Sequence, residues 1–166
     1  FLSTQYIRHH SRPLYTSEPD VVHELIGHVA SLAHPRIAEA NVRMGEAALT
    51  ATPTEALRLE RVYWYVLEFG LVEEGNEVRA FGAGLLSSAG ELEQMRGGPE
   101  LRSWCLDTIA NTPYDPTQMQ PWLFVAPSFD RLLTDLLAWV DDGRWRDDHP
   151  AARPVMRATE PSLPLR

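Results

Sequence analysis

The chain of 166 residues contains no lysine, so all fifteen of its basic residues are arginines. This absence excludes a lysine Schiff base and also a P-loop, whose lysine contacts the nucleotide phosphates. The single cysteine, Cys105, permits no internal disulfide, no zinc ribbon and no CxxC redox pair, which favours a reducing, cytoplasmic location. No run of residues approaches the roughly 18 consecutive apolar positions of a membrane-spanning helix. The sequence therefore predicts a cytoplasmic protein that does not enter the membrane.

The charge balance is acidic, with 23 aspartates and glutamates against 15 arginines and a net charge of −8. Nucleic-acid binding needs clustered positive charge, so we expect no nucleic-acid partner. The length suits one domain, and a hydrophobic content of 44% can build one core. The C-terminal residues lack heptads, which favours a monomer. Small molecules are the ligands that this composition favours.

The apolar pattern predicts an α+β fold that is predominantly α-helical and contains a small β-hairpin or sheet. Residues 71–81 form two alternating runs around Gly75-Asn76, which is typical of a hairpin. Pro19 and Pro53 are suited to the first turns of helices. Longer helices are expected at about 19–33, 36–50, 53–68 and 129–140, with a short helix at 91–95 and a strand at 121–125.

The segment His23-Glu24-Leu25-Ile26-Gly27-His28 and the distant Glu68 supply the candidate metal ligands. Two imidazoles and one carboxylate are the donor set that holds a non-heme ferrous ion and leaves open positions for oxygen. On an ideal helix His23 and His28 point roughly 140° apart, so a local i to i+5 bulge is needed to bring them to one face. We predict distorted helix geometry near Gly27, whose missing side chain relaxes the backbone.

Two alternatives to an iron site stay open for these residues. The zinc-protease pattern places its histidines at i and i+4 with the intervening glutamate as base, and the present spacing misses it by one residue. Glu68 lies between apolar neighbours, and burying a lone carboxylate is costly unless a cation compensates. A metal would compensate, and so would an arginine. A zinc hydrolase with Glu24 as general base is therefore a competing hypothesis.

Five motifs occur in order along the chain. They are Thr4-Gln5-Tyr6-Ile7-Arg8-His9, Pro13-Leu14-Tyr15-Thr16 with Glu18-Pro19-Asp20, the segment from His23 to His28, the segment from Tyr63 to Gly70, and Gly82-Ala83-Gly84-Leu85-Leu86-Ser87-Ser88. Together they closely resemble the pterin-dependent aromatic amino acid hydroxylases, and within that family the bacterial phenylalanine 4-hydroxylases. The resemblance extends over roughly residues 1–132. It implies Fe(II) held by His23, His28 and Glu68, with a tetrahydropterin of the biopterin type and O2 as cosubstrates.

The resemblance also implies roles for other residues. Arg8 would receive the carboxylate of the substrate and Asp20 would brace it, since a guanidinium binds a carboxylate through two bonds. Ser87 would orient a ligand histidine and Glu24 would face the pterin. The alternatives without a role in function are a structural ion pair for Arg8 and Asp20, a turn serine for Ser87 and a solvated helix carboxylate for Glu24. The implied walls of the substrate pocket are Tyr15, Thr16 and Trp64, whereas His9, His10, His34 and His149 match no ligand role.

The activity implied by the resemblance is hydroxylation of a free aromatic amino acid, with L-phenylalanine converted to L-tyrosine. Ala89 stands where phenylalanine hydroxylases usually carry Phe, which leaves tryptophan or another aromatic substrate as an alternative. Residues 1–142 are expected to form the iron-binding catalytic domain, without the N-terminal stretch that the family uses for pterin. A repurposed, pterin-independent iron-binding relative is therefore a further alternative. Residues 143–166 are expected to form a Pro/Arg-rich tail that is mostly unpacked.

Overall fold

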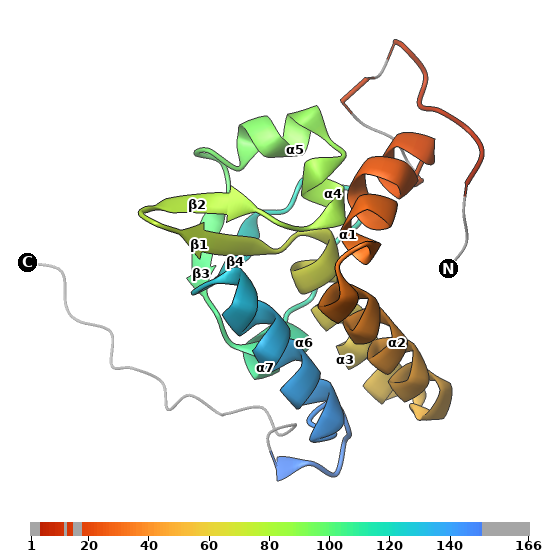
Figure 1. Ribbon diagram of the computed structural model, residues 1–166, viewed down its shortest axis with the longest axis vertical. Coiled ribbons are helices and arrows are strands. Elements are labelled where there is room, and N and C mark those ends of the chain that lie inside the picture. Colours follow the sequence, from red (N-terminus) through yellow and green to blue (C-terminus); the bar gives the residue numbers. More distant parts are fainter. Residues whose placement is uncertain (1–3, 12, 15–17, 151–166) are drawn as a thin grey trace, which may run out of the picture.

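The structure is a computed structural model that describes residues 4–11, 13–14 and 18–150. Helices and a small mixed sheet alternate along the chain, which confirms the predicted α+β, mainly helical class (Figure 1). The elements are η1 (His23–Val29), α1 (Ala30–Leu32), α2 (Pro35–Thr50), α3 (Pro53–Val62), η2 (Tyr63–Glu68), β1 (Leu71–Glu74), β2 (Glu77–Ala80), α4 (Ala83–Leu86), α5 (Ala89–Gln94), β3 (Glu100–Ser103), α6 (Leu106–Ala110), β4 (Trp122–Ala126) and α7 (Phe129–Asp141). The two segments labelled η are π-helices.

The sheet has the strand order β2-β1-β4-β3. β1 and β2 pair in antiparallel fashion, as predicted, and their turn places Gly75 at a φ of +65°, a conformation that glycine adopts without strain. β4 runs parallel to both β1 and β3. The sheet therefore joins a local hairpin to two strands that follow much later in the chain.

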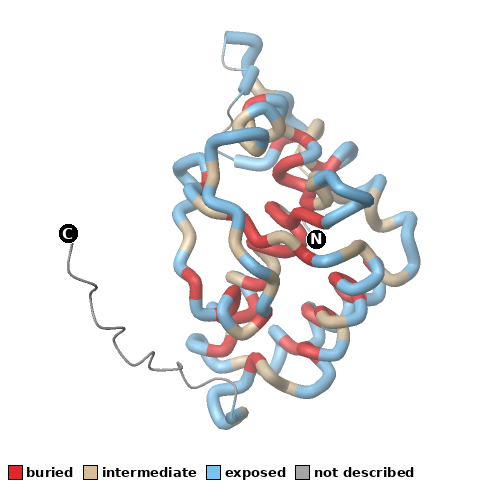
Figure 2. The backbone as a smooth tube through the Cα atoms, turned by 90° about the vertical axis from the view of Figure 1, so that its left-hand side faces the viewer, coloured by how far each residue is buried: buried red, intermediate tan, exposed pale blue. Residues whose placement is uncertain are grey.

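The core lies where the long helices meet one another and the sheet. α2 packs against α7, α3 packs against α6, and α7 also contacts β1 and β4. The largest fully buried side chains include Trp139, Tyr65 and Phe124, and Figure 2 shows the buried segments in the interior of the molecule. Among the described residues, no helix combines the length and the apolar character needed to cross a membrane.

α2 and α7 begin and end within one residue of the predicted bounds, and α3 begins at the predicted Pro53. α3 starts with a capping box, in which the Thr52 side chain accepts from the Glu55 backbone and the Glu55 side chain accepts from the Thr52 backbone. α3 then runs directly into η2, so the predicted continuous helix to Glu68 changes its hydrogen-bond pattern at Tyr63.

The predicted unpacked tail needs correction at its start. Trp145 is only 3% exposed and its indole Nε1 donates to the carbonyl of Val140 at 3.1 Å. The backbone N–H of Asp147 donates to Oε1 of Glu55 at 3.1 Å, which ties this segment to α3. Packing therefore continues beyond residue 142, because a tryptophan buries enough apolar surface to anchor a polar, arginine-rich segment. Residues 151–166 lie outside the described part of the chain.

Candidate active site

Two π-helical segments carry the three candidate metal ligands. In η1 the backbone N–H of Ala30 donates to the carbonyl of Leu25, and in η2 the N–H of Phe69 donates to the carbonyl of Trp64 at 2.8 Å. Both bonds span five residues, so side chains five apart share a face. This confirms the predicted distortion near Gly27, although the π-helix extends over seven residues, His23–Val29, and is not a single bulge. The π geometry of η2 was not predicted.

Gly27 also has a steric role that the sequence did not indicate. A Cβ built on Gly27 would lie 2.8 Å from the carbonyl oxygen of Ala83 and 2.9 Å from the Cβ of Ala83. Both distances are well below ordinary van der Waals contact. Glycine therefore lets η1 approach α4 closely, and α4 leads directly to Ser87.

The ligand atoms of His23, His28 and Glu68 converge on one point, and all lie within 4.8 Å of one another. Nε2 of His28 lies 3.0 Å from Nε2 of His23 and 3.0 Å from Oε1 of Glu68, while Nε2 of His23 lies 3.5 Å from Oε2 of Glu68. Two ligand atoms at right angles, each about 2.1 Å from a metal, would lie about 3.0 Å apart. The spacing and the donor set therefore fit one divalent cation held on one face.

Ser87 fixes which nitrogen of His23 carries the proton. The Ser87 hydroxyl donates to the carbonyl of Ala83 at 2.7 Å, so its oxygen is left to accept from Nδ1 of His23 at 2.9 Å. A proton on Nδ1 leaves Nε2 as the nitrogen with a free lone pair, and Nε2 is the atom that faces Glu68. The predicted orienting role of Ser87 is thus matched by its geometry, and Ser87 is buried.

The pKa values of the two histidines shift in opposite directions. Burial lowers the pKa of His23 and outweighs the opposing charge of Glu68, which favours the neutral ring. Burial acts in the same direction on His28, but the hydrogen bond and charge of Glu68 overcome it and raise the pKa of His28. A cation bound at this site would therefore compete with a proton at His28.

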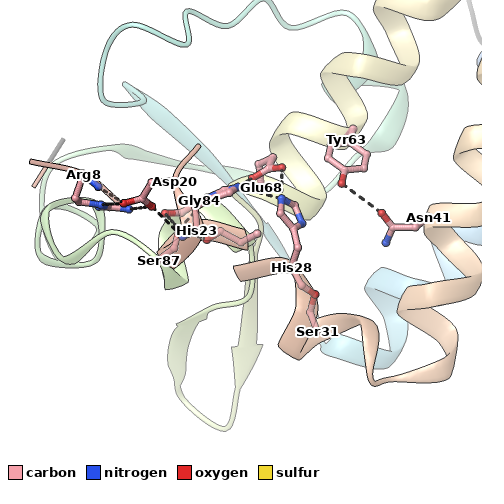
Figure 3. A network of polar contacts seen from close by, with 11 residues as sticks. Arg8, Asp20, His23, His28, Ser31, Asn41, Tyr63, Glu68, Gly84 and Ser87 are labelled. Carbon is pink, nitrogen blue, oxygen red and sulfur yellow. Dashed lines mark hydrogen bonds and ion pairs between the residues drawn. The ribbon is translucent and has the colours of Figure 1, made fainter. Parts of the chain in front are cut away.

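Asp20 connects Arg8 to the beginning of the helix that carries His23. The Asp20 carboxylate is completely buried and accepts from Nε, Nη2 and the backbone N–H of Arg8, each at 2.8 Å, and from the backbone N–H of His23 at 3.0 Å. Hydrogen bonding to Arg8 holds the pKa of Asp20 well below its usual range and raises that of Arg8. Figure 3 shows the resulting line of polar contacts from Arg8 through Asp20 and His23 to Glu68 and His28.

A cavity of about 290 Å³ joins these groups. Arg8, His23, Glu68 and Ser87 all line it. One wall is aromatic: the Trp64 ring stacks on Tyr114 with centroids 4.3 Å apart and also contacts Phe69 at 4.7 Å. A volume near the low end of small-molecule sites suits a ligand of the size of one amino acid.

Glu24 projects from η1 into the interior and is 5% exposed. Its Oε2 is buried and has no hydrogen-bond partner within the described ranges of the chain. The alternative of a solvated helix carboxylate is therefore wrong. Burying an unpaired carboxylate oxygen is costly, so this atom fits a site that a polar ligand completes.

The sequence matches the family described as "Biopterin-dependent aromatic amino acid hydroxylase" over residues 1–144. The chain belongs to the biopterin-dependent aromatic amino acid hydroxylase family. It is 56% identical over 131 residues to a chloroplastic phenylalanine 4-monooxygenase of Chlamydomonas reinhardtii, covering 79% of this chain and 34% of that protein. It is 46% identical over 131 residues to rat tyrosine 3-monooxygenase, covering 78% of this chain and 26% of that protein.

Solved hydroxylases share the fold. The phenylalanine hydroxylase of Legionella pneumophila superposes with a TM-score of 0.78 at 30% identity, covering 87% of this chain and 62% of that one. The Chromobacterium violaceum phenylalanine hydroxylase with bound oxidised Fe(III) gives a TM-score of 0.76 at 31% identity, covering 93% and 59% respectively. The chain spans about a quarter to a third of the length of the curated hydroxylases that it matches.

The structure brings together most of the residues that the hydroxylase resemblance selected. His23, His28, Glu68, Arg8, Asp20, Trp64 and Ser87 surround one cavity or brace its lining, and Glu24 is buried on the same helix as the two histidines. Tyr15 and Thr16 lie outside the described residues. His9 contacts Ser11, His34 packs against Phe129, and neither belongs to the cluster of candidate ligands.

Sequence reasoning assigned no role to several residues that line the cavity, among them Phe69, Tyr114 and Glu91. Phe69 directly follows the candidate ligand Glu68, so its position was available from the sequence. Tyr114 lies in a loop between α6 and β4, and no spacing rule connects it to Trp64. Glu91 lies one turn after the Ser87-Ser88 motif and carries no pattern of its own.

Proposed function

We propose that this chain forms the iron site and the amino acid pocket of a pterin-dependent monooxygenase that converts free L-phenylalanine to L-tyrosine. The convergence of His23, His28 and Glu68 beside an arginine and an aromatic wall in one cavity carries the proposal. Membership in the biopterin-dependent hydroxylase family supports the reaction class, and the bacterial phenylalanine hydroxylases with the same fold support the substrate.

In this proposal His23, His28 and Glu68 hold Fe(II), and Glu24 contributes to the pterin site. Iron with tetrahydropterin supplies the electrons and the open coordination positions for activation of O2. Arg8 binds the substrate carboxylate, and Asp20 holds the guanidinium in place through two bonds at 2.8 Å. Trp64 and Phe69 form the aromatic surface beside the substrate ring and exclude water from it.

Which aromatic amino acid is the substrate is the more specific part of the proposal. Both phenylalanine 4-monooxygenases and tyrosine 3-monooxygenases are among the relatives, at 56% and 46% identity respectively. Among the described residues, the cavity lining near Trp64 offers apolar and aromatic surface. Such a surface accepts the unsubstituted ring of phenylalanine without leaving a substrate hydroxyl unpaired.

The decisive experiment loads the purified chain anaerobically with ferrous iron and supplies L-phenylalanine, L-tyrosine and L-tryptophan in turn. Each is incubated with O2, with and without tetrahydropterin, and products are identified by mass. We expect hydroxylated L-phenylalanine only in the presence of pterin, and none from the Glu68→Ala variant. Product from L-tyrosine or L-tryptophan alone would reassign the substrate, and turnover without pterin would identify a pterin-independent relative.

We also propose that the chain acts as a monomer in a reducing, cytoplasmic compartment. The single cysteine, Cys105, is exposed, and a reducing location keeps it as a thiol. Light scattering at several protein concentrations tests the monomer, because a dimer would double the mass measured.

A further inference from the structure

A free amino acid presents two opposite charges, and the pocket needs a partner for each. Under the proposed function, on which this inference rests, Arg8 takes the carboxylate. The ammonium group loses its water on entering the cavity and needs an acceptor there, because an unpaired buried charge is strongly unfavourable. A carboxylate in the cavity lining is the group that provides both the acceptor and the opposite charge.

Four glutamates line the cavity: Glu18, Glu60, Glu68 and Glu91. Glu68 faces the two histidines, and Glu60 accepts a hydrogen bond from the hydroxyl of Tyr114. Glu18 is exposed, and its backbone carbonyl accepts from the Tyr6 hydroxyl at 2.5 Å. Glu68 thus belongs to the ligand cluster, Glu60 contacts the aromatic wall, and Glu18 lies at the solvent-facing rim.

Glu91 differs from the other three glutamates in the contacts of its carboxylate. It is half-buried in the first turn of α5, and within the described part of the chain its carboxylate makes no hydrogen bond or ion pair. Burial raises the pKa of Glu91, as expected for a carboxylate that loses water in the cavity lining. The cavity thus contains a partly desolvated carboxylate that has no charge partner among the described residues.

The backbone holds Glu91 at a defined place beside the metal ligands. Its N–H donates to the side chain of Ser88 at 3.3 Å, and Ser88 follows Ser87, which contacts His23. The preceding Gly90 is buried, and a Cβ there would lie 3.3 Å from Leu14. Glu91 is therefore connected through Ser88 to Ser87, the residue that contacts the ligand histidine His23.

We propose that Glu91 receives the ammonium group of the substrate, so that Arg8 and Glu91 together select a free α-amino acid. The ligand class follows from this pair. Aromatic acids without an amino group would lose the contact with Glu91, and aromatic amines without a carboxylate would lose the contact with Arg8. N-acylated residues and internal peptide positions would be rejected because their nitrogen carries no charge.

The test compares L-phenylalanine with 3-phenylpropionate, which has the same ring and carboxylate but no amino group. Binding of each is measured by calorimetry on the chain loaded with Co(II), for the wild type, Glu91→Gln, Glu91→Asp and Glu93→Gln. Glu93 lies on the same short helix, is exposed and does not line the cavity, so it is the matched control. The metal content of each variant shows whether the site has stayed intact.

We expect Glu91→Gln to weaken L-phenylalanine binding by roughly tenfold to a hundredfold, the range for a charge-assisted hydrogen bond. Binding of 3-phenylpropionate and the metal content should stay unchanged, Glu91→Asp should recover part of the loss, and Glu93→Gln should behave as the wild type. Equal losses for both ligands, or no loss for either, would overturn the role of Glu91 while leaving the proposed function intact. A wild type that binds no aromatic amino acid would overturn both.

Discussion

Gly27→Ala tests whether close contact between η1 and α4 determines the geometry of the metal site. The added methyl would lie 2.8 Å from the Ala83 carbonyl oxygen and 2.9 Å from its Cβ, so the two helices must separate. Overpacking of this kind costs about 1–3 kcal/mol. Replacing a helical glycine by alanine also returns about 0.4–1 kcal/mol by restricting the unfolded chain. The net free energy of unfolding should therefore fall by up to about 2.5 kcal/mol.

Gly45→Ala is the matched control. Gly45 lies inside α2, and a Cβ there would meet nothing within 4 Å, so only the stabilising effect remains. The two variants should differ by the overpacking cost alone, which corresponds to roughly 2–12 °C in Tm for a chain of this size. Thermal and denaturant unfolding of the two proteins without metal measures this difference. Equal Tm values for the two variants would refute the argument that Gly27 is required by contact with Ala83.

Other predictions address the site directly. Glu68→Ala should leave the purified protein without stoichiometric iron after ferrous loading, whereas retained iron would show that the third ligand is misassigned. Arg8→Lys should raise KM for the amino acid strongly and leave iron content unchanged, because lysine cannot form the two-bonded contact. Ser87→Ala should weaken metal affinity about 10–100-fold in a chelator competition, since His23 loses the partner that sets its tautomer. Ionised Asp20 has a lowered pKa in the folded protein, so its contribution to stability is complete at neutral pH and is lost as the pH falls below about 4. Asp20→Asn should therefore show a flatter dependence of unfolding free energy on pH between about 4 and 2 than the wild type.

The parts of the fold that could be predicted are those that local chemistry determines. Gly75-Asn76 between alternating runs predicted the hairpin, and the five-residue spacing of His23 and His28 predicted helix distortion, because an α-helix cannot place both rings on one face. β3 was missed because its four residues show no apolar alternation and only Arg102 is partly buried, as on an edge strand. Its stabilisation comes from pairing with β4, which lies about 20 residues further on.

In the candidate site, too, some features follow from local sequence and others from tertiary contacts. The two histidines lie in one short motif, and the family resemblance assigned the distant Glu68 to the predicted ligand set, but the cavity is assembled from elements that are distant in the chain. Tyr114 joins the wall by stacking on Trp64, and the contact of Gly27 with Ala83 depends on how two helices cross. Trp145 was assigned to a tail because the surrounding composition is polar, whereas its burial comes from packing into the main hydrophobic core.

The four hydrogen bonds accepted by Asp20 have a consequence for how the protein could change over evolution. One carboxylate holds both the guanidinium proposed to bind substrate and the first turn of the helix that carries two metal ligands. Loss of the positive charge at Arg8 would therefore disturb the start of η1 as well as recognition of the substrate carboxylate, whereas a lysine would keep a cation beside Asp20. A lineage that gave up this cation together with recognition of the amino acid carboxylate would have to rebuild the start of η1 at the same time, because an unpaired Asp20 could not stay buried there.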